Sequence, residues 1–415
     1  MLWRRSIAQV AVVLAAWSAL SGCVGPNAIR YTRLRYNEVV RDTNDEQLLM
    51  NIVRLRYADS PVFIDLPNIT SQFEMSGGTG YLGGYGNQFK GGTTSLGNGS
   101  LSLRDTPTLS YHPREGREIA KSLLTPLSSD LFIVVNAGAD IEQLLLLATN
   151  DINDVRNAPR STYLIPKVGD DNALFLRGIR LLASIRTRDG SELAFGTNEE
   201  TDGASDPIPE SAIHGRDLLN AAHDGYVFRA QKEEGRMTVL KREKDLVLKI
   251  RDPFVDSPEM LEVEQIFRLI PGQSMYKIKS ELTDEAYQRQ RRPNPLGNDT
   301  IYMNLRSVLQ IMTFLSKGVC VPDEHVISGV VPVTPGTDGQ PFDWTQVTAG
   351  HFTVHAQKHR PRNAEVAVPY RGYWFYIAGD DVQSRATLAI LEVFFALQES
   401  DGKSAGPLLT LPVGG

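Results

Sequence analysis

Three histidines spaced four residues apart form the clearest metal-ligand pattern in the chain. His351, His355 and His359 would share one face of a helix and could bind zinc there. Residues 352–356, however, alternate between apolar and polar side chains, which is typical of a strand. On a strand that rises about 3.3 Å per residue, the outer two histidines would lie roughly 26 Å apart. The sequence therefore predicts a strand here, with no metal site and no cofactor.

A glycine-rich segment over residues 77–86 contains the letters G-x-G-x-x-G from Gly78 to Gly83. The dinucleotide-binding fingerprint requires a strand before it, a helix after it and an acidic residue about 20 positions later. Here more glycine follows, and then residues 95–103 show the period of two that is typical of a strand. The segment predicts the tip of a β-hairpin over residues 63–112 rather than a phosphate-binding loop.

No set of residues suited to catalysing hydrolysis is evident in the sequence. The motifs G-x-S-x-G, H-E-x-x-H and S-x-x-K do not occur in a catalytic context. Asp380 and Asp381 precede an apolar segment of helical period, which indicates a helix cap rather than an acid pair. We predict no catalytic residue and a protein that is not an enzyme.

Aromatic side chains cluster in residues 370–376. Aromatic residues favour half-buried strands, so the segment predicts a strand that contributes to the core. The alternative is a ligand or partner surface formed by Tyr373, Trp374 and Tyr376.

The two cysteines have different settings. Cys320 lies between Val319 and Val321, which predicts a buried and unreactive thiol. Cys23 ends the tetrapeptide Leu20-Ser21-Gly22-Cys23, which follows an apolar run over residues 7–20 and the cationic pair Arg4-Arg5. That run is too short to span a bilayer, which needs about 20 apolar residues, and it fits the apolar region of a signal peptide.

The tetrapeptide resembles the lipobox of bacterial lipoproteins, formed here by Leu20, Ser21 and Gly22 before Cys23. The resemblance implies a signal peptide over residues 1–22 and a diacylglyceryl group on the Cys23 thiol, which would hold the protein to a membrane. In well-studied Gram-negative bacteria an aspartate after the cysteine retains lipoproteins in the inner membrane, and Val24 stands there instead. The resemblance therefore implies an outer-membrane protein whose body faces the periplasm.

Charge and periodicity set the broad class. The net charge of −6 is spread along the 415 residues, which argues against nucleic acid as a partner. Helices and strands mix without a βαβ rhythm, so we predict an α+β fold with mainly antiparallel strands and a Gly-rich hairpin near the N-terminus. The predicted helices are 43–59 (with a Thr43/Glu46 capping box), 114–125, 140–152, 170–186, 299–318 and 383–398. The predicted strands include 193–195, 237–250 (as a hairpin), 274–282, 352–356 and 364–377.

The expected organisation has five parts. These are the signal peptide (1–22), a tether (23–42), a helix with the Gly-rich hairpin and a helical pair (43–160), a middle α/β region (161–292) and a C-terminal α+β domain (293–415).

Several segments resemble a family of uncharacterised lipoproteins found in Gram-negative genomes. They are residues 44–57, 107–111, 122–126 and 370–377. The resemblance implies an envelope lipoprotein and assigns no activity.

Together these observations predict a non-catalytic structural, scaffold or transport component of an envelope assembly, as a homo-oligomer or in an envelope protein complex. The strand pair over residues 63–112 either enters the membrane within an oligomer or is a soluble hairpin with a flexible tip. The alternatives for function are a periplasm-facing hydrolase of cell-wall or polysaccharide substrates, using exposed carboxylates with His351 or His355, and a ligand-binding module.

Overall fold

The computed structural model describes residues 24–81, 97–114, 117–157, 170–200, 208–224, 226–230, 235–280, 297–336, 339–348 and 351–399. Cys23, the three lipobox residues before it and the predicted signal peptide lie outside the described residues. The chain divides into two compact units, Val62–Ala120 and the remainder. Helices combine with antiparallel-dominated sheets, which confirms the predicted α+β class.

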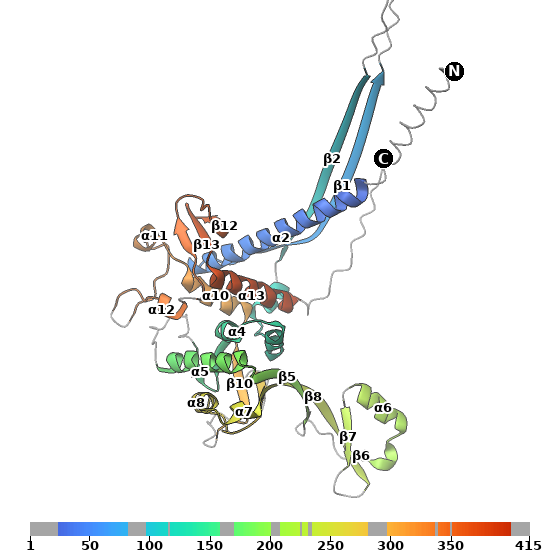
Figure 1. Ribbon diagram of the computed structural model, residues 1–415, viewed down its shortest axis with the longest axis vertical. Helices are drawn as coiled ribbons and strands as arrows, with labels where there is room; N and C mark the ends of the chain where they lie inside the picture. The colour runs from blue at the N-terminus through green and yellow to red at the C-terminus, as the bar shows by residue number, and fades with distance from the viewer. Residues whose placement is uncertain are drawn as a thin grey trace, which may run out of the picture. The chain divides into compact units, whose positions relative to one another are not determined.

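The unit Val62–Ala120 contains two long strands, drawn as a ribbon pair in Figure 1. β1 (Phe63–Tyr81) pairs antiparallel with β2 (Gly97–Arg114), from Phe63 opposite Arg114 to Tyr81 opposite Gly97. The register shifts between Asp65 and Asn68, around Pro67, because proline cannot donate to the ladder. Residues 82–96 lie outside the described residues, so the Gly-rich tip of the hairpin stays a prediction.

The other unit begins with a long helix, α2 (Val24–Arg56). The predicted helix start at Thr43 is wrong, because α2 begins well before this residue. The tether expected over residues 23–42 stays a prediction. The Thr43 hydroxyl donates to the carbonyls of Val39 (2.9 Å) and Val40 (3.0 Å), which places Thr43 inside the helix rather than at its cap. After Pro26 in the first turn, no proline or glycine occurs before Pro61, so nothing interrupts the helix.

The main sheet of this unit has, among the described residues, the strand order β4-β3-β10-β9-β8-β5, and β6 and β7 pair with β8. Its strands are β3 (Thr149–Ile152), β4 (Val155–Arg156), β5 (Ser191–Glu200), β6 (Ile208–Pro209), β7 (Tyr226–Ala230), β8 (Arg236–Ile250), β9 (Met275–Ser280) and β10 (Thr300–Leu305). β9 and β10 pair in parallel across the expected domain boundary at residues 292–293.

Three predictions fail at this sheet. Residues 237–250 belong to one strand, β8, instead of a hairpin, and β8 pairs along its length with β5, from Ser191 opposite Ile250 to Glu200 opposite Lys241. The helix predicted over 299–318 is the strand β10 followed by a helix that starts after Ser307. The helix predicted over 140–152 ends at Ala148 and continues as β3.

The unit also contains helices and short 3₁₀ turns. They are α3 (Arg117–Leu124), whose first turn belongs to the other unit, α4 (Ile141–Ala148), α5 (Asp170–Thr187), α6 (Gly215–His223), α7 (Asp252–Val255), α8 (Pro258–Ile266), α10 (Val308–Leu315), α11 (Asp323–Ile327), α12 (Thr345–Thr348) and α13 (Val382–Glu399), with 3₁₀ turns η1 (Ser129–Ala137), η2 (Glu210–Ala212) and η3 (Ser316–Gly318). The predicted cap at Asp381 is confirmed, because its carboxylate accepts from the Ser384 amide (3.0 Å). Asp140 caps α4 in the same way and accepts from the Glu142 amide (2.9 Å). No helix in the described part of the chain is long and apolar enough to cross a membrane.

Arg306 connects α4 to the sheet. Its side chain is 4% exposed and donates to the carbonyls of Leu146 and Leu147 (3.0 Å each) at the end of α4. The guanidinium also donates to Asn150 Oδ1 (3.0 Å) and lies 4.4 Å from the Phe314 ring centroid. These groups satisfy carbonyls that the helix end leaves open, so α4 can stop inside the core.

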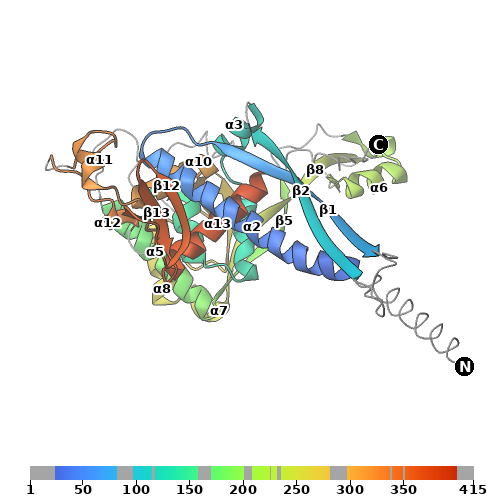
Figure 2. The same ribbon diagram turned by 90° about the horizontal axis from the view of Figure 1, so that it is seen from above.

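A second, three-stranded sheet has the order β11-β13-β12, with β11 (His355–Gln357), β12 (Ala364–Tyr370) and β13 (Tyr373–Ala378). The strand predicted over 364–377 is therefore two strands. They are joined by Arg371 (φ 45°) and Gly372 (φ 83°), the conformation of a two-residue type I′ turn. Figures 1 and 2 show α2 beside this sheet, and its residues Leu49, Ile52 and Val53 are fully buried.

Candidate functional site

The three aromatic residues predicted as a surface lie on β13 but on two faces of the sheet. Tyr373 shares its face with Phe375 and Ile377, which are fully buried, because alternate residues of a strand point the same way. Trp374 and Tyr376 point to the opposite face and are half-buried. The structure thus brings Trp374 and Tyr376 together and separates Tyr373 from them.

On the inner face, Tyr373 belongs to a network that we call the inner cluster: Tyr57, Asp59, Glu324, His325, Lys358, Tyr370, Arg371 and Tyr373. At its centre the Tyr57 hydroxyl lies 2.6 Å from His325 Nδ1. The Tyr57 ring meets the rings of His325 and Tyr370 edge-on, with centroids 5.6 and 5.3 Å apart. Burial raises the pKa of Tyr57 to about 12, so this hydroxyl stays protonated at neutral pH.

Asp59 ties the end of α2 to the β12–β13 turn. Its carboxylate accepts hydrogen bonds from the Tyr370 hydroxyl and from Arg371 Nη2 (2.9 Å). The hydrogen bond from Tyr370, followed by that from Arg371, holds the pKa of Asp59 below its ordinary value. The Arg371 guanidinium also lies 5.4 Å from the centroid of the Tyr57 ring.

Glu324 and Lys358 close the other side of the inner cluster. Lys358 Nζ lies 2.9 Å from Glu324 Oε1 and 5.7 Å from the centroid of the Tyr373 ring. Hydrogen bonds from Lys358 and Tyr373 lower the pKa of Glu324. The polar groups of the inner cluster thus bind one another, which makes it a connection between α2, α11 and the second sheet.

The opposite face, which we call the outer face, consists of Trp374, Tyr376 and their neighbours across the strands. Trp374 stands opposite Gln357 of β11 and Pro369 of β12, and Tyr376 stands opposite His355 and Ala367. The rings of His355 and Tyr376 lie 5.4 Å apart at 38°. The Arg360 guanidinium lies 5.3 Å from the centroid of the Trp374 ring. This face can offer flat aromatic surface, an amide, an imidazole and a guanidinium to a ligand.

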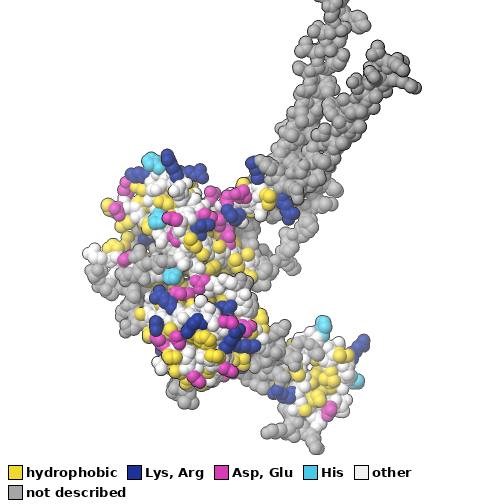
Figure 3. All heavy atoms as spheres, in the orientation of Figure 1, with side chains coloured by type: hydrophobic (Ala, Val, Ile, Leu, Met, Phe, Trp, Pro, Cys, Tyr) yellow, Lys and Arg dark blue, Asp and Glu magenta, His cyan; other side chains and the backbone are white. Residues whose placement is uncertain are grey.

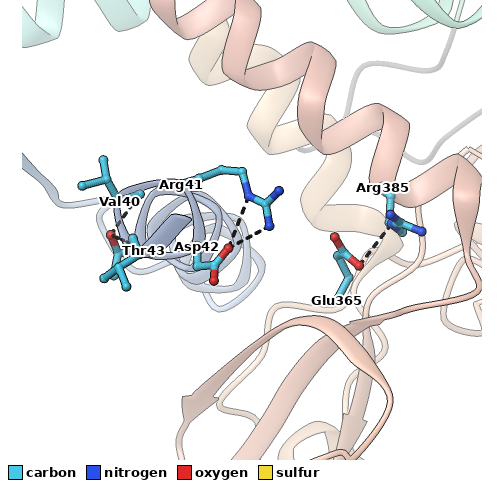
Figure 4. Close-up of polar contacts among 7 residues, drawn as sticks. Val40, Arg41, Asp42, Thr43, Glu365 and Arg385 are labelled. Atoms are coloured by element: carbon cyan, nitrogen blue, oxygen red, sulfur yellow. Dashed lines mark hydrogen bonds and ion pairs between the residues drawn. The ribbon is translucent and has the colours of Figure 1, made fainter. Parts of the chain in front are cut away.

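The sequence segment that contains β11 is rich in basic residues. No acidic residue occurs from 344 to 364, and that segment contains His351, His355, Lys358, His359, Arg360 and Arg362. Figure 3 shows Lys, Arg and His side chains gathered at the end of the body where the second sheet lies. The next acidic residue, Glu365, pairs with Arg385 (3.3 Å), as Figure 4 shows.

A polar cavity of about 320 Å³ adjoins this region, lined by residues of α2 from Arg41 to Glu46 and by residues 360–367. Arg41 pairs with its neighbour Asp42 at 2.9 Å (Figure 4). Near it, the carboxyl groups of Asp45 on α2 and Glu392 on α13 share a hydrogen bond. Burial, and then the hydrogen bond and charge of Asp45, raise the pKa of Glu392 to about 7.

The three histidines occupy separate settings. His355 lies on β11, and of the strand predicted over residues 352–356 only residues 355 and 356 belong to it. His351 lies before that strand, and burial lowers the pKa of its imidazole. The His359 carbonyl accepts from Gln357 Nε2 (2.8 Å). No group of three or more His, Cys, Asp or Glu that could hold a metal ion occurs among the residues that the structure describes.

The predicted burial of Cys320 is wrong. Val319 is buried and bridges to Val354, and the alternation of an extended chain then points the next side chain outward. Partial desolvation by its neighbours still raises the pKa of the thiol, which keeps it protonated at neutral pH.

Comparison of the chain with protein-family models, with curated proteins and with solved structures found no match. The resemblance to a lipoprotein family therefore stays a prediction.

Proposed function

We propose that the protein is a lipoprotein of the outer membrane, anchored through a diacylglyceryl group on Cys23 and facing the periplasm. In this proposal it serves as a non-catalytic structural, scaffold or transport component of an envelope assembly. The tetrapeptide Leu20-Ser21-Gly22-Cys23 supports the anchor, and the residue after it is the first residue of α2.

The observation that carries the proposal is the continuity of α2 from Val24 into the core. A helix of 33 residues is about 50 Å long. Its last third is locked in place, since Leu49, Ile52 and Val53 have no exposed surface. A lipid on Cys23 would thus be joined to the body by a helix rather than by a flexible tether, which suits a component that holds a fixed spacing from a membrane.

The state of the inner cluster supports a non-catalytic role. Asp59 accepts hydrogen bonds from Tyr370 and Arg371, and the Tyr57 hydroxyl is bonded to His325, so these groups hold α2, α11 and the second sheet together. The raised pKa of Tyr57 also disfavours the phenolate that a nucleophile would need.

The anchor is tested with the variant Cys23→Ala and the matched control Ser21→Ala, which keeps a small residue before the cysteine. Cells are labelled with a palmitate analogue and separated into membrane and soluble fractions. We expect the wild type and Ser21→Ala to carry label and to sediment with outer membranes, and Cys23→Ala to carry none. Equal labelling of Cys23→Ala, or an unlabelled wild type, would contradict the proposal.

A further inference from the structure

The antiparallel ribbon of β1 and β2 has one wholly polar face. From Asn68 opposite Ser110 to the end of β1, the register continues without a shift. Residues directly opposite each other lie on the same face of a sheet, as do alternate residues of one strand. Over this stretch one face therefore holds only glycine and residues of polar type, among them Glu74 and Arg104.

The opposite face of the ribbon is mainly apolar. Over the same stretch it holds one charged residue, Asp105. Its apolar residues include Ile69, Phe73, Met75, Leu101, Leu103 and Leu109. Polarity that is confined to one face is typical of a sheet that buries its other face. Two strands alone are marginally stable in water at best, so a ribbon of this kind needs further strands or a packing partner.

Both edges of the ribbon lack a further strand within the described part of the chain, because its sheet consists of β1 and β2 alone (Figures 1 and 2). Sheet edges that stay unpaired usually carry lysine, proline or a bulge. Neither strand contains lysine, and residues 68–81 and 97–106 contain no proline. Pro67, Pro107, Pro113 and the register shift all lie nearer to the other end of the ribbon. The edges next to residues 82–96 are therefore suited to pairing with another strand.

We propose that β1 of one copy of the protein pairs antiparallel with β2 of a neighbouring copy, so that one sheet continues from chain to chain. β1 and β2 run in opposite directions, so the free edge of β1 in one copy and the free edge of β2 in the next form an antiparallel pair. A register shifted by zero, two or four residues keeps the polar faces of all copies on one side and keeps most of the ladder.

The two edges are also complementary in charge. Over the stretch without a register shift, Glu74 of β1 and Arg104 of β2 are the only charged residues of the polar face. Opposite charges that face each other across two strands stabilise a sheet, whereas like charges destabilise it. Pairing of β1 with β2 between copies therefore brings a carboxylate toward a guanidinium, as the register within one chain already does.

A second copy accounts for both edges at once. A strand from a different protein would pair with one edge and leave the other open. A single ribbon in a lipid bilayer would leave the N–H and C=O groups of both edges without partners. A contact between two different edges is head-to-tail, so the copies form a ring or a row of more than two rather than a two-fold dimer. The inference rests on the proposed function only in that these copies would be the subunits of the envelope assembly.

The first test is the native mass of the protein purified from cells in a mild detergent. We expect species of more than two copies, because head-to-tail contacts add one copy after another. A monomer, or a dimer and nothing larger, would overturn the proposal. The lipid anchor would be unaffected by that result, because palmitate labelling tests it separately.

The second test locates the contact with disulfides between two differently tagged chains made in the same cells. Both chains carry Cys320→Ser, because the native thiol is exposed. One chain carries Ser76→Cys on β1, and the other carries a single cysteine at a position of β2 on the same face: Asn98→Cys, Ser100→Cys, Ser102→Cys, Arg104→Cys or Thr106→Cys.

Successive positions of this series lie about 7 Å apart, which is beyond the reach of one disulfide. We therefore expect mild oxidation to join the two tags in one of the five combinations, and that combination gives the register between copies. The matched control has Ser76→Cys in both chains and should give no disulfide. No disulfide in any of the five combinations, or a disulfide between two β1 strands in the control, would overturn the proposal.

Discussion

At the scale of single residues, two buried or half-buried polar groups have consequences for stability. Arg306 completes the end of α4 from inside the core, and the carboxyl pair Asp45–Glu392 joins α2 to α13. Both are polar groups whose partners are far away in the sequence. Their interactions therefore exist only in the folded state and change the free energy of unfolding.

The carboxyl pair predicts how stability depends on pH. The pKa of Glu392 is raised from 4.5 to about 7 in the folded protein, so the folded state binds more protons than the unfolded state between these values. The contribution of Glu392 to stability is therefore fully present below about pH 4.5 and is lost as pH rises through 7. With allowance for solvent screening, the loss is about 1–2 kcal/mol.

Glu392→Gln keeps a hydrogen-bonding group beside Asp45 but cannot ionise. Urea denaturation from pH 5 to 8 should show a smaller fall in the free energy of unfolding for this variant than for the wild type. Glu262→Gln, at an exposed ion pair, is the control and should follow the wild type. A wild-type profile that rises through pH 7, or an unchanged slope in Glu392→Gln, would contradict this account of the pair.

Arg306→Met keeps an apolar, unbranched side chain but removes the guanidinium and its donors. The carbonyls of Leu146 and Leu147 and the amide oxygen of Asn150 then lose their partner, which should cost about 3 kcal/mol of folding free energy. Denaturant unfolding measures the loss, and Arg268→Met, at an exposed site, should change it little. A variant as stable as the wild type would show that the carbonyls find other donors.

At the scale of elements, the sequence predicted correctly the features that neighbouring residues determine, and it failed where pairing between distant strands determines the structure. The cap at Asp381 involves neighbouring residues, and the sequence predicted it correctly. β10 was mistaken for a helix because Ile301 and Leu305 fit the helical spacing of α10, whereas pairing with β3 and β9 decides its conformation. The capping box at Ser307 and Gln310 was the available signal for the true start of α10.

The turn between β12 and β13 depends on the backbone conformation of one glycine. Gly372 has φ 83°, which a β-branched residue adopts only with strain. Gly372→Val should destabilise the protein by about 1–2 kcal/mol, measured by thermal and urea unfolding.

Gly215→Ala is the matched control for that substitution, since nothing lies within 4 Å of its Cβ position and its φ is not positive. Equal effects of the two substitutions would mean that the turn does not depend on the left-handed conformation.

The continuity of α2 is tested at Val39, which is 58% exposed. Val39→Pro removes a helical hydrogen bond and should break the helix before its buried part. We expect reduced helicity by circular dichroism and new protease cleavage around residues 33–42, with the core intact, whereas Val39→Ala should resist cleavage. Equal cleavage of Val39→Ala and Val39→Pro would show that this part of α2 is not a stable helix.

At the scale of the whole molecule, the α+β class was predictable from the pattern of helical and strand periods along the chain. The inner cluster was not, because Tyr57 and His325 are 268 residues apart and neither belongs to a motif. The separation of Tyr373 from Trp374 follows from strand alternation, but which side faces the core depends on where α2 packs. Contacts between residues far apart in the sequence could therefore not be predicted from local sequence patterns.

The central claim is that this folded body is held to a membrane by a lipid on Cys23, the residue immediately before α2. The most direct test is the intact mass and N-terminal peptide of the protein extracted from outer membranes. The account predicts a chain that begins at Cys23 and carries diacylglyceryl on the cysteine. A membrane-extracted chain that retains residues 1–22, or one that begins elsewhere with an unmodified Cys23, would contradict it.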